Sequence, residues 1–126
     1  MNNHHLLRQR IRYVKHLRLQ RKMNVYIAPN CFGYGLRLEH PFGIFVNSKA
    51  RIGNYANIHQ MVTIGNNGKT NDAATIGDNC YIGANSVIVG EIILGDNIVV
   101  GAGSVVTKNF ASNKTIVGVP AREIMK

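Results

Sequence analysis

The chain has 126 residues, two cysteines and a formal net charge of +9, with 15 basic against 6 acidic residues. This length indicates one domain, two cysteines exclude a disulfide framework, and no apolar run is long enough for a membrane span or a signal peptide. We therefore expect a cytoplasmic protein with reduced thiols. Because so small a domain buries limited surface, we also expect self-association.

Residues 1–23 predict a basic amphipathic helix. Leu7, Ile11 and Val14 have the i, i+4, i+7 spacing of one apolar face, and no acidic residue precedes Glu39. The simplest interpretation is that this face docks on the rest of the domain. Contact with an anionic membrane surface, which would make the protein membrane-peripheral, or with a polyanion such as a glycan are alternatives. Low aromatic content and the absence of a recognition module argue against nucleic acid.

A six-residue repeat runs from Gly43 to Lys108. Position 4 of ten hexads is aliphatic; these residues are Val46, Ile52, Ile58, Ile64, Ile76, Ile82, Ile88, Leu94, Val100 and Val106. Position 2 is small or apolar throughout. Position 5 is glycine in six of the ten hexads, which is typical of a bend that takes positive φ and has no room for a Cβ. Two inward positions followed by a bend predict short strands that stack into a parallel β-helix over residues 24–126.

Three segments interrupt this repeat, and we expect function to reside in them. Residues 37–42 fit the turn pattern only if Pro41 and Phe42 are two extra residues, so a bulge follows His40. Residues 66–73 are polar and lack an inward aliphatic residue, which predicts a projecting loop. The tail from Asn109 ends the repeat, and residues 121–126 predict a short cap over the open end of the β-helix.

The segments 38–44, 50–53, 62–65, 101–106 and 118–122 resemble the serine acetyltransferase branch of the hexapeptide-repeat acyltransferases. The resemblance covers the chain from about residue 24 to its end. It implies an all-β, left-handed parallel β-helix, a homotrimer, and acetyl-CoA bound in the groove between neighbouring subunits. The left hand comes from the resemblance alone, because crossovers between parallel strands are normally right-handed.

The family's catalytic base is a histidine at the position that His40 occupies here. A hydroxyl is a poor nucleophile at neutral pH, and a neutral imidazole within hydrogen-bond reach takes its proton during attack on the thioester. A backbone N–H of the coil then stabilises the oxyanion. Glu39 is a candidate acidic partner of His40. His59 and Tyr26 are candidate contacts of the acceptor, although an exposed corner residue is the simpler interpretation of His59.

The resemblance also places the cofactor. Small residues allow close approach of the pantetheine arm, and positive charge suits the phosphate end. The candidates are Gly65, Ala84 and Ala102 for the arm, with Lys108 and Arg122 for the phosphates. No metal is expected, because the repeat offers only two histidines.

Two departures from the serine enzymes decide the expected acceptor. The aspartate that orients the family's catalytic histidine corresponds to Tyr26 or Val25, and the loop lacks the second histidine that helps hold the serine carboxylate. We therefore expect a sugar O-acetyltransferase that acts on a surface-polysaccharide precursor. The alternatives are a serine O-acetyltransferase, a metal-dependent hydratase, which would need three histidine ligands, and a non-catalytic trimeric scaffold.

Overall fold

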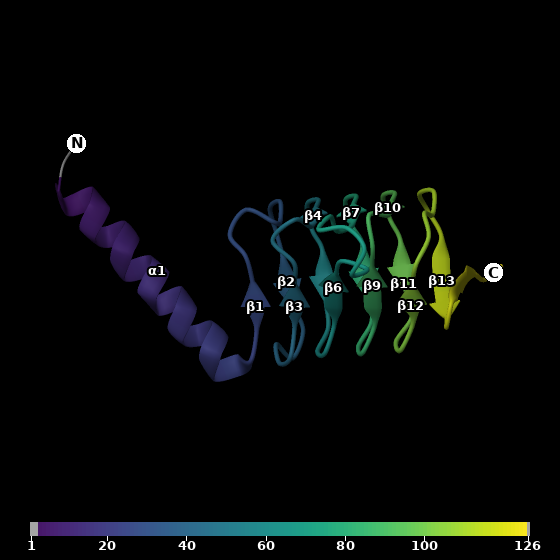
Figure 1. Cartoon of the computed structure of the whole chain (residues 1–126), viewed down its shortest axis with the longest axis horizontal. Coiled ribbons are helices and arrows are strands. Elements are labelled where there is room, and N and C mark those ends of the chain that lie inside the picture. Colours follow the sequence, from purple (N-terminus) through teal and green to yellow (C-terminus); the bar gives the residue numbers. More distant parts are fainter. Residues whose placement is uncertain (1–2, 126) are drawn as a thin grey trace.

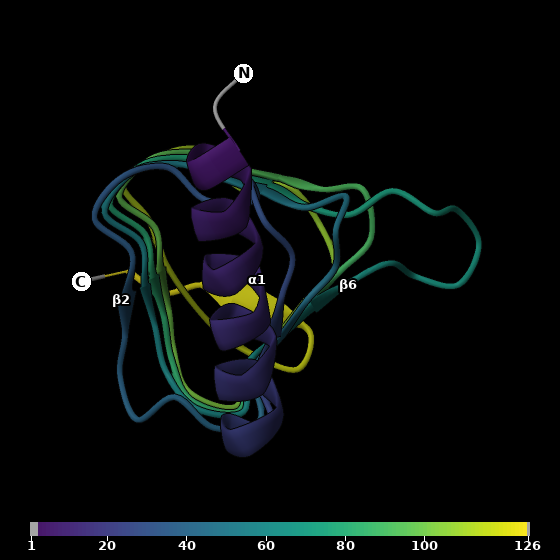
Figure 2. The ribbon, with the colours of Figure 1, turned by 90° about the vertical axis from the view of Figure 1, so that its left-hand side faces the viewer.

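The structure, a computed structural model, describes residues 3–125 as one long helix followed by a stack of short strands (Figure 1), whose outline is triangular when viewed along the stack (Figure 2). The elements are α1 (Asn3–Met23), β1 (Tyr26–Ile27), β2 (Arg37–Leu38), β3 (Phe45–Val46), β4 (Arg51–Ile52), β5 (Asn57–Ile58), β6 (Thr63–Gly65), β7 (Thr75–Ile76), β8 (Tyr81–Ile82), β9 (Val87–Val89), β10 (Ile93–Leu94), β11 (Val99–Val100), β12 (Val105–Val106), β13 (Thr115–Gly118) and β14 (Ala121–Glu123).

The strands form three parallel sheets, one on each side of the triangle. Sheet A has the order β1-β3-β6-β9-β12, sheet B the order β4-β7-β10, and sheet C the order β2-β5-β8-β11-β13. Strand β14 closes sheet C by pairing antiparallel with β13. Strands that follow each other in the chain therefore belong to successive sides, and each coil lies against the next. The parallel β-helix predicted from the hexads is confirmed.

Hexad positions 2 and 4 fill the interior. The ten aliphatic residues at position 4 are at most 5% exposed. In sheet A the register places Val46 on Ile64, Ile64 on Ile88 and Ile88 on Val106, so like side chains stack from coil to coil. Each fully buried aliphatic side chain contributes about 1.5–3 kcal/mol of hydrophobic stabilisation. The predicted ladder of core side chains is confirmed.

The glycines at hexad position 5 serve a different purpose from the one predicted. Positive φ occurs two residues later, for example at Tyr55 (58°) and Asn79 (56°), and not at Gly53 or Gly77. A Cβ on Gly77 would lie 2.8 Å from the carbonyl carbon and oxygen of Gly95 in the next coil. The expected positive φ was wrong. The expected lack of room for a Cβ is confirmed at Gly53, Gly77 and Gly95, where neighbouring coils approach closely at one corner, but not at Gly65.

A row of polar side chains joins the coils at the corner between sheets B and C. Asp78 Oδ1 accepts a hydrogen bond from the N–H of Asn54 (2.7 Å), Asp96 Oδ1 from the N–H of Asp78 (2.7 Å), and Ser112 Oγ from the N–H of Asp96 (2.8 Å). Each side chain thus satisfies a backbone donor that the turn leaves free. We call these four residues the corner ladder.

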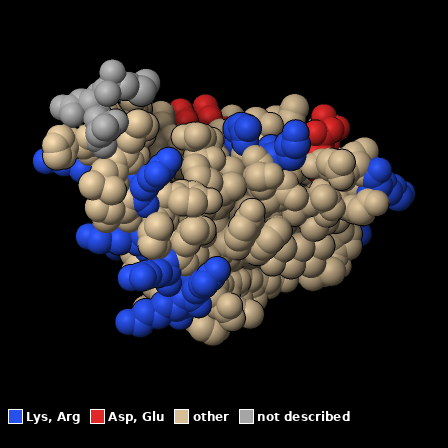
Figure 3. All heavy atoms as spheres, turned by 60° about the vertical axis from the view of Figure 1, so that its left-hand side comes forward, with Lys and Arg blue, Asp and Glu red and all other residues tan. Residues whose placement is uncertain are grey.

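Helix α1 extends away from the β-helix and does not lie along it (Figure 1). Leu7, Ile11 and Val14 are 57%, 47% and 46% exposed, and Gln20 near the helix end anchors α1 by donating from Nε2 to the Ile27 carbonyl (2.7 Å). The simplest interpretation, that this apolar face docks on the domain, was wrong. Arg18 takes the next position of the same face, so a cation interrupts the stripe. Figure 3 shows the Lys and Arg side chains gathered on the helix.

In the part of the chain that the structure describes, no helix is both long and apolar enough to cross a membrane. Between β6 and β7, residues 66–73 leave the triangular outline as a projecting loop (Figure 2). Asn67 shapes this loop, because its Oδ1 accepts hydrogen bonds from the N–H groups of Lys69 (2.9 Å) and Thr70 (3.2 Å).

Both cysteines are buried thiols, as predicted for Cys80. Their exposed fractions are 2% for Cys31 and 1% for Cys80, and burial raises the pKa of each thiol. The thiolate is the reactive form, so a raised pKa and poor access act in the same direction. We predict that a disulfide reagent labels the native protein at least about a hundredfold more slowly than the urea-unfolded protein, because access needs a costly local opening. Equal rates in the two states would contradict this prediction.

Candidate active site

His40 lies at the corner where sheet C leads into sheet A. Six residues (39–44) separate β2 from β3, whereas four (59–62 and 83–86) make the equivalent corners of the next two coils. The two extra residues predicted after His40 are therefore present. His40 itself is exposed and has a φ of 51°, a left-handed conformation that is unfavourable for a residue other than glycine. The longer corner presents the imidazole to solvent.

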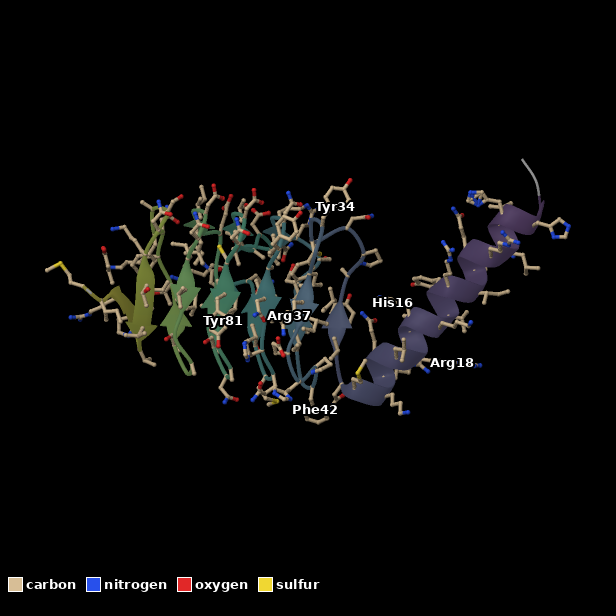
Figure 4. The ribbon with its side chains drawn as sticks, turned by 180° about the vertical axis from the view of Figure 1, so that it is seen from behind. His16, Arg18, Tyr34, Arg37, Phe42 and Tyr81 are labelled. Atoms are coloured by element: carbon tan, nitrogen blue, oxygen red, sulfur yellow. The ribbon has the colours of Figure 1, made fainter. Side chains whose placement is uncertain are left out.

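The register of sheet C determines which side chains surround this corner. Arg37 pairs with Asn57 and Asn57 with Tyr81, so these three form one outward-facing row. The Glu39 N–H donates to the Ile58 carbonyl (2.9 Å), which places Glu39 beside His59 in a second outward row. Figure 4 shows Arg37 and Tyr81 on the same face of the β-helix.

Glu39 is engaged by a neighbour other than His40. Its Oε1 forms an ion pair with Nε of Arg37, the residue two positions earlier on the same side of β2. Among residues 3–125, no hydrogen bond joins Glu39 to His40. The carboxylate would have to leave Arg37 before it could orient the imidazole.

His59 packs against an aromatic ring and does not project from an exposed corner. Its imidazole lies 4.8 Å, centroid to centroid, from the ring of Tyr81, at an interplanar angle of 53°. The second acceptor candidate, Tyr26, lies on sheet A, where its half-exposed ring stacks on Phe45 at 5.3 Å. The two acceptor candidates therefore lie on different sides of the β-helix.

The cofactor candidates lie in three places on the chain. Ala84 and Ala102 occupy the same corner as His40, in the following coils, and the Gly103 N–H donates to the Ala84 carbonyl (2.8 Å). Because their side chains are short, the surface along that corner carries no large side chain at these two positions. The residues on the corner between sheets A and B are Gly65 and Lys108, and Arg122 lies on β14 opposite Val117. A single chain does not bring all five together.

Asn57, Gln60 and Tyr81 lie in the two coils that follow the candidate base, but the sequence prediction did not include them. Asn57 and Tyr81 are 24 residues apart because the loop adds to the coil between them, and this offset conceals their pairing in the sequence. Both residues are at hexad position 3, which faces outward. An amide and an aromatic ring at this position in adjacent coils were the sequence signal that could have revealed a site. Within residues 3–125 no group of three or more His, Cys, Asp or Glu side chains is placed to hold a metal ion.

The comparisons with known proteins agree on one family. The family model described as the hexapeptide repeat of succinyl-transferase matches residues 73–108. The serine acetyltransferase of Synechococcus elongatus is 35% identical over 129 residues, which cover 98% of this chain and 53% of that protein.

Solved structures give the same result. Soybean serine acetyltransferase in complex with serine superposes with a TM-score of 0.82 at 37% identity, over 96% of this chain and 52% of that one. A serine acetyltransferase in complex with CoA gives a TM-score of 0.76 at 32% identity, over 95% and 52%. The chain therefore spans about half the length of the relatives it matches.

These matches confirm the left-handed parallel β-helix and correct the predicted acceptor. The sugar O-acetyltransferase interpretation, with its role in polysaccharide biosynthesis, was wrong, because these relatives are serine acetyltransferases at identities such as 35% and 44%. That interpretation gave two missing side chains more weight than the rest of the chain. The comparisons give no support to a membrane or glycan contact of α1. The chain belongs to the hexapeptide-repeat acyltransferase family, on its serine acetyltransferase-like branch.

Proposed function

We propose that this protein is a serine O-acetyltransferase that uses acetyl-CoA, with His40 as the general base. The observation that carries the proposal is the longer corner after β2, which exposes an imidazole in line with the small residues Ala84 and Ala102. The proposal of serine as the acceptor is supported by the similarity to serine acetyltransferases. The relatives named above include one solved with serine and one with CoA.

The proposed mechanism assigns one proton cycle to His40. Bound acetyl-CoA supplies a thioester carbonyl that the serine hydroxyl attacks. Neutral His40 accepts the hydroxyl proton as the new C–O bond forms, and the imidazolium returns this proton to the departing sulfur as the C–S bond breaks. A coil N–H near the corner stabilises the oxyanion in between. His40 is neutral again at the end of the cycle, so no further acid is needed.

We propose a homotrimer as the active form. Ala84 and Ala102 lie at one corner of the chain, whereas Gly65 and Lys108 lie at another, with sheet A between them. One groove can contain all four only where the corner of one subunit faces the other corner of its neighbour. Exposed apolar side chains on the outer faces, such as Phe45 (42%) and Ile93 (60%), also favour contact between subunits.

The test is release of CoA thiol from acetyl-CoA with L-serine, beside D-serine, L-threonine and a panel of amino sugars as acceptors. We expect turnover with L-serine that exceeds turnover with every other acceptor. Turnover confined to a sugar would contradict the proposed acceptor, and a trimer that binds no CoA would mean a non-catalytic scaffold. Light scattering on the same sample measures the assembly, and a monomer with full activity would contradict the proposed trimer.

A contact between α1 and an anionic membrane surface is a separate proposal. Its support is charge: seven Lys and Arg residues lie on α1, no acidic residue accompanies them, and their side chains are exposed. We expect co-sedimentation with vesicles that contain about one third anionic lipid, and loss of binding in high salt because the attraction is electrostatic. Equal recovery with neutral vesicles, or no binding at all, would contradict it.

A further inference from the structure

Three buried polar atoms in the coil next to the candidate base lack a hydrogen-bond partner among the described residues. They are Asn57 Oδ1, His59 Nε2 and Gln60 Oε1. A buried polar atom without a partner costs about 1–3 kcal/mol, and native structures contain few of them. Three such atoms within four consecutive residues therefore indicate that a partner is missing at this place.

The position of these residues connects them with the chemistry at His40. Asn57 and His59 alternate with the inward Ile58, so both point out of sheet C on the same side. His59 lies beside Glu39 in the coil register, and Gln60 follows at the corner that carries His40 in the neighbouring coil. A ligand that reaches these atoms therefore lies in the coil next to the corner that carries His40.

Side chains from the two adjacent coils border this cluster, one set on each side. On the β2 side lie Arg37 and Glu39, held together by their ion pair. On the β8 side the ring of Tyr81 packs on His59 at 4.8 Å. The residue opposite His59 in that coil is Gly83, directly after β8, which has no side chain to contact the imidazole.

The chemistry of the unpaired atoms selects the kind of group that fits. The amide oxygens of Asn57 and Gln60 are acceptors, and His59 Nε2 is an acceptor in the neutral tautomer that carries its proton on Nδ1. A group with several N–H donors and a positive charge can donate to all three, and the face of the Tyr81 ring favours a cation. A carboxylate finds no donor among the three unpaired atoms.

We propose that Asn57, His59 and Gln60 form a subsite for the α-ammonium group of the amino-acid acceptor, with Tyr81 as its cover. This inference rests on the proposed function, because it names the part of serine that the subsite binds. The three atoms are buried with Tyr81 in its present position, so the ring swings outward for the ammonium group to enter. Tyr81 is 37% exposed, so one side of its ring borders solvent and the movement is toward that side.

The experiment compares L-serine with 3-hydroxypropionate, which lacks the ammonium group, in the full chain with acetyl-CoA. For wild type we expect kcat/KM to be higher with L-serine. The substitutions His59→Leu and Asn57→Val should lower kcat/KM for L-serine by about tenfold to a hundredfold, since each removes a hydrogen bond to a charged group. The loss should appear mainly in KM, and 3-hydroxypropionate should be affected little. His16→Leu, a histidine on α1, is the control and should leave both acceptors unchanged.

Equal losses with both acceptors would overturn the subsite, because a merely structural role does not distinguish them. An unchanged ratio between the acceptors in both variants would overturn it too. Thermal unfolding guards against misfolding as an explanation. His59→Leu should unfold at the same or a higher temperature than wild type, since it removes a buried polar atom without a partner.

A binding measurement separates failure of this inference from failure of the proposed function. If wild type does not acetylate serine, the proposed function fails, and calorimetric titration with ethanolamine, which keeps the ammonium group, and with 3-hydroxypropionate still tests the subsite. We expect the Kd of ethanolamine to be at least about tenfold higher for His59→Leu than for wild type. Tyr81→Phe should retain this binding and Tyr81→Leu should weaken it, because the aromatic face is what attracts the cation. Equal affinity of wild type and His59→Leu for ethanolamine would overturn the inference.

Discussion

His40→Asn lowers kcat for acetyl transfer to serine by about a hundredfold to ten-thousandfold, the range expected for loss of a general base. Without the imidazole, the serine hydroxyl must lose its proton to water as it attacks. The measurement is the steady-state rate of thiol release at saturating acetyl-CoA. A kcat within tenfold of wild type would contradict the assignment of His40 as the base.

Asparagine is a better replacement than alanine at this position. His40 has a φ of 51°, and asparagine tolerates the left-handed region better than most residues. His40→Ala removes the base and also strains the corner, so the two variants separate chemistry from folding. CoA affinity should be unchanged in His40→Asn, because the proposed mechanism gives His40 contact with the acceptor hydroxyl and not with CoA. Loss of CoA binding would mean that the corner had collapsed.

Gly77→Ala reduces the free energy of unfolding by about 3 kcal/mol, the upper part of the range for overpacking. The new methyl group would lie 2.8 Å from the backbone of Gly95, and only movement of the whole coil relieves that contact. Such movement also lengthens the hydrogen bond from the Gly77 N–H to the Leu94 carbonyl (2.9 Å). Urea unfolding, followed by circular dichroism, measures the change.

Gly65→Ala is the matched control for this substitution. Its added Cβ meets only the Thr63 methyl group, at 3.9 Å, and its φ is not positive. We expect its unfolding free energy to remain within about 0.5 kcal/mol of wild type, as is usual for substitutions that create no clash. Similar losses for the two variants would contradict this explanation, because Gly65→Ala makes no close contact with a neighbouring coil.

The β-helix could be predicted from the sequence because each coil repeats the same local rule. Ile64 and Ile88 are buried for the same reason, and a period in the sequence records that reason directly. The purpose of the glycines could not be predicted so well. Gly77 is compatible with a positive φ and also with the close approach of two coils. Only the position of Gly95 in the next coil distinguishes these two explanations.

The candidate site could be predicted only in part. His40 lies in a motif and at an interruption of the repeat, so the sequence points to it twice. The pairing of Asn57 with Tyr81 depends on how the coils are aligned, and the loop at 66–73 shifts that alignment. The position of α1 depends on contacts that its own periodicity does not record, because a helix with Leu7 and Ile11 on one face can dock or remain exposed.

The corner ladder has a consequence for how the molecule comes apart. Asp78 joins Asn54 to its own coil and Asp96 joins Asp78 to the next, so every link connects adjacent coils and none bridges across several. A coil in the middle is clamped from above and below, whereas a coil at either end has one neighbour only. Loss of structure therefore starts at the ends and travels inward one coil at a time. The antiparallel strand β14 pairs with β13 at the C-terminal end of the stack, so we expect it to slow unfolding from that end.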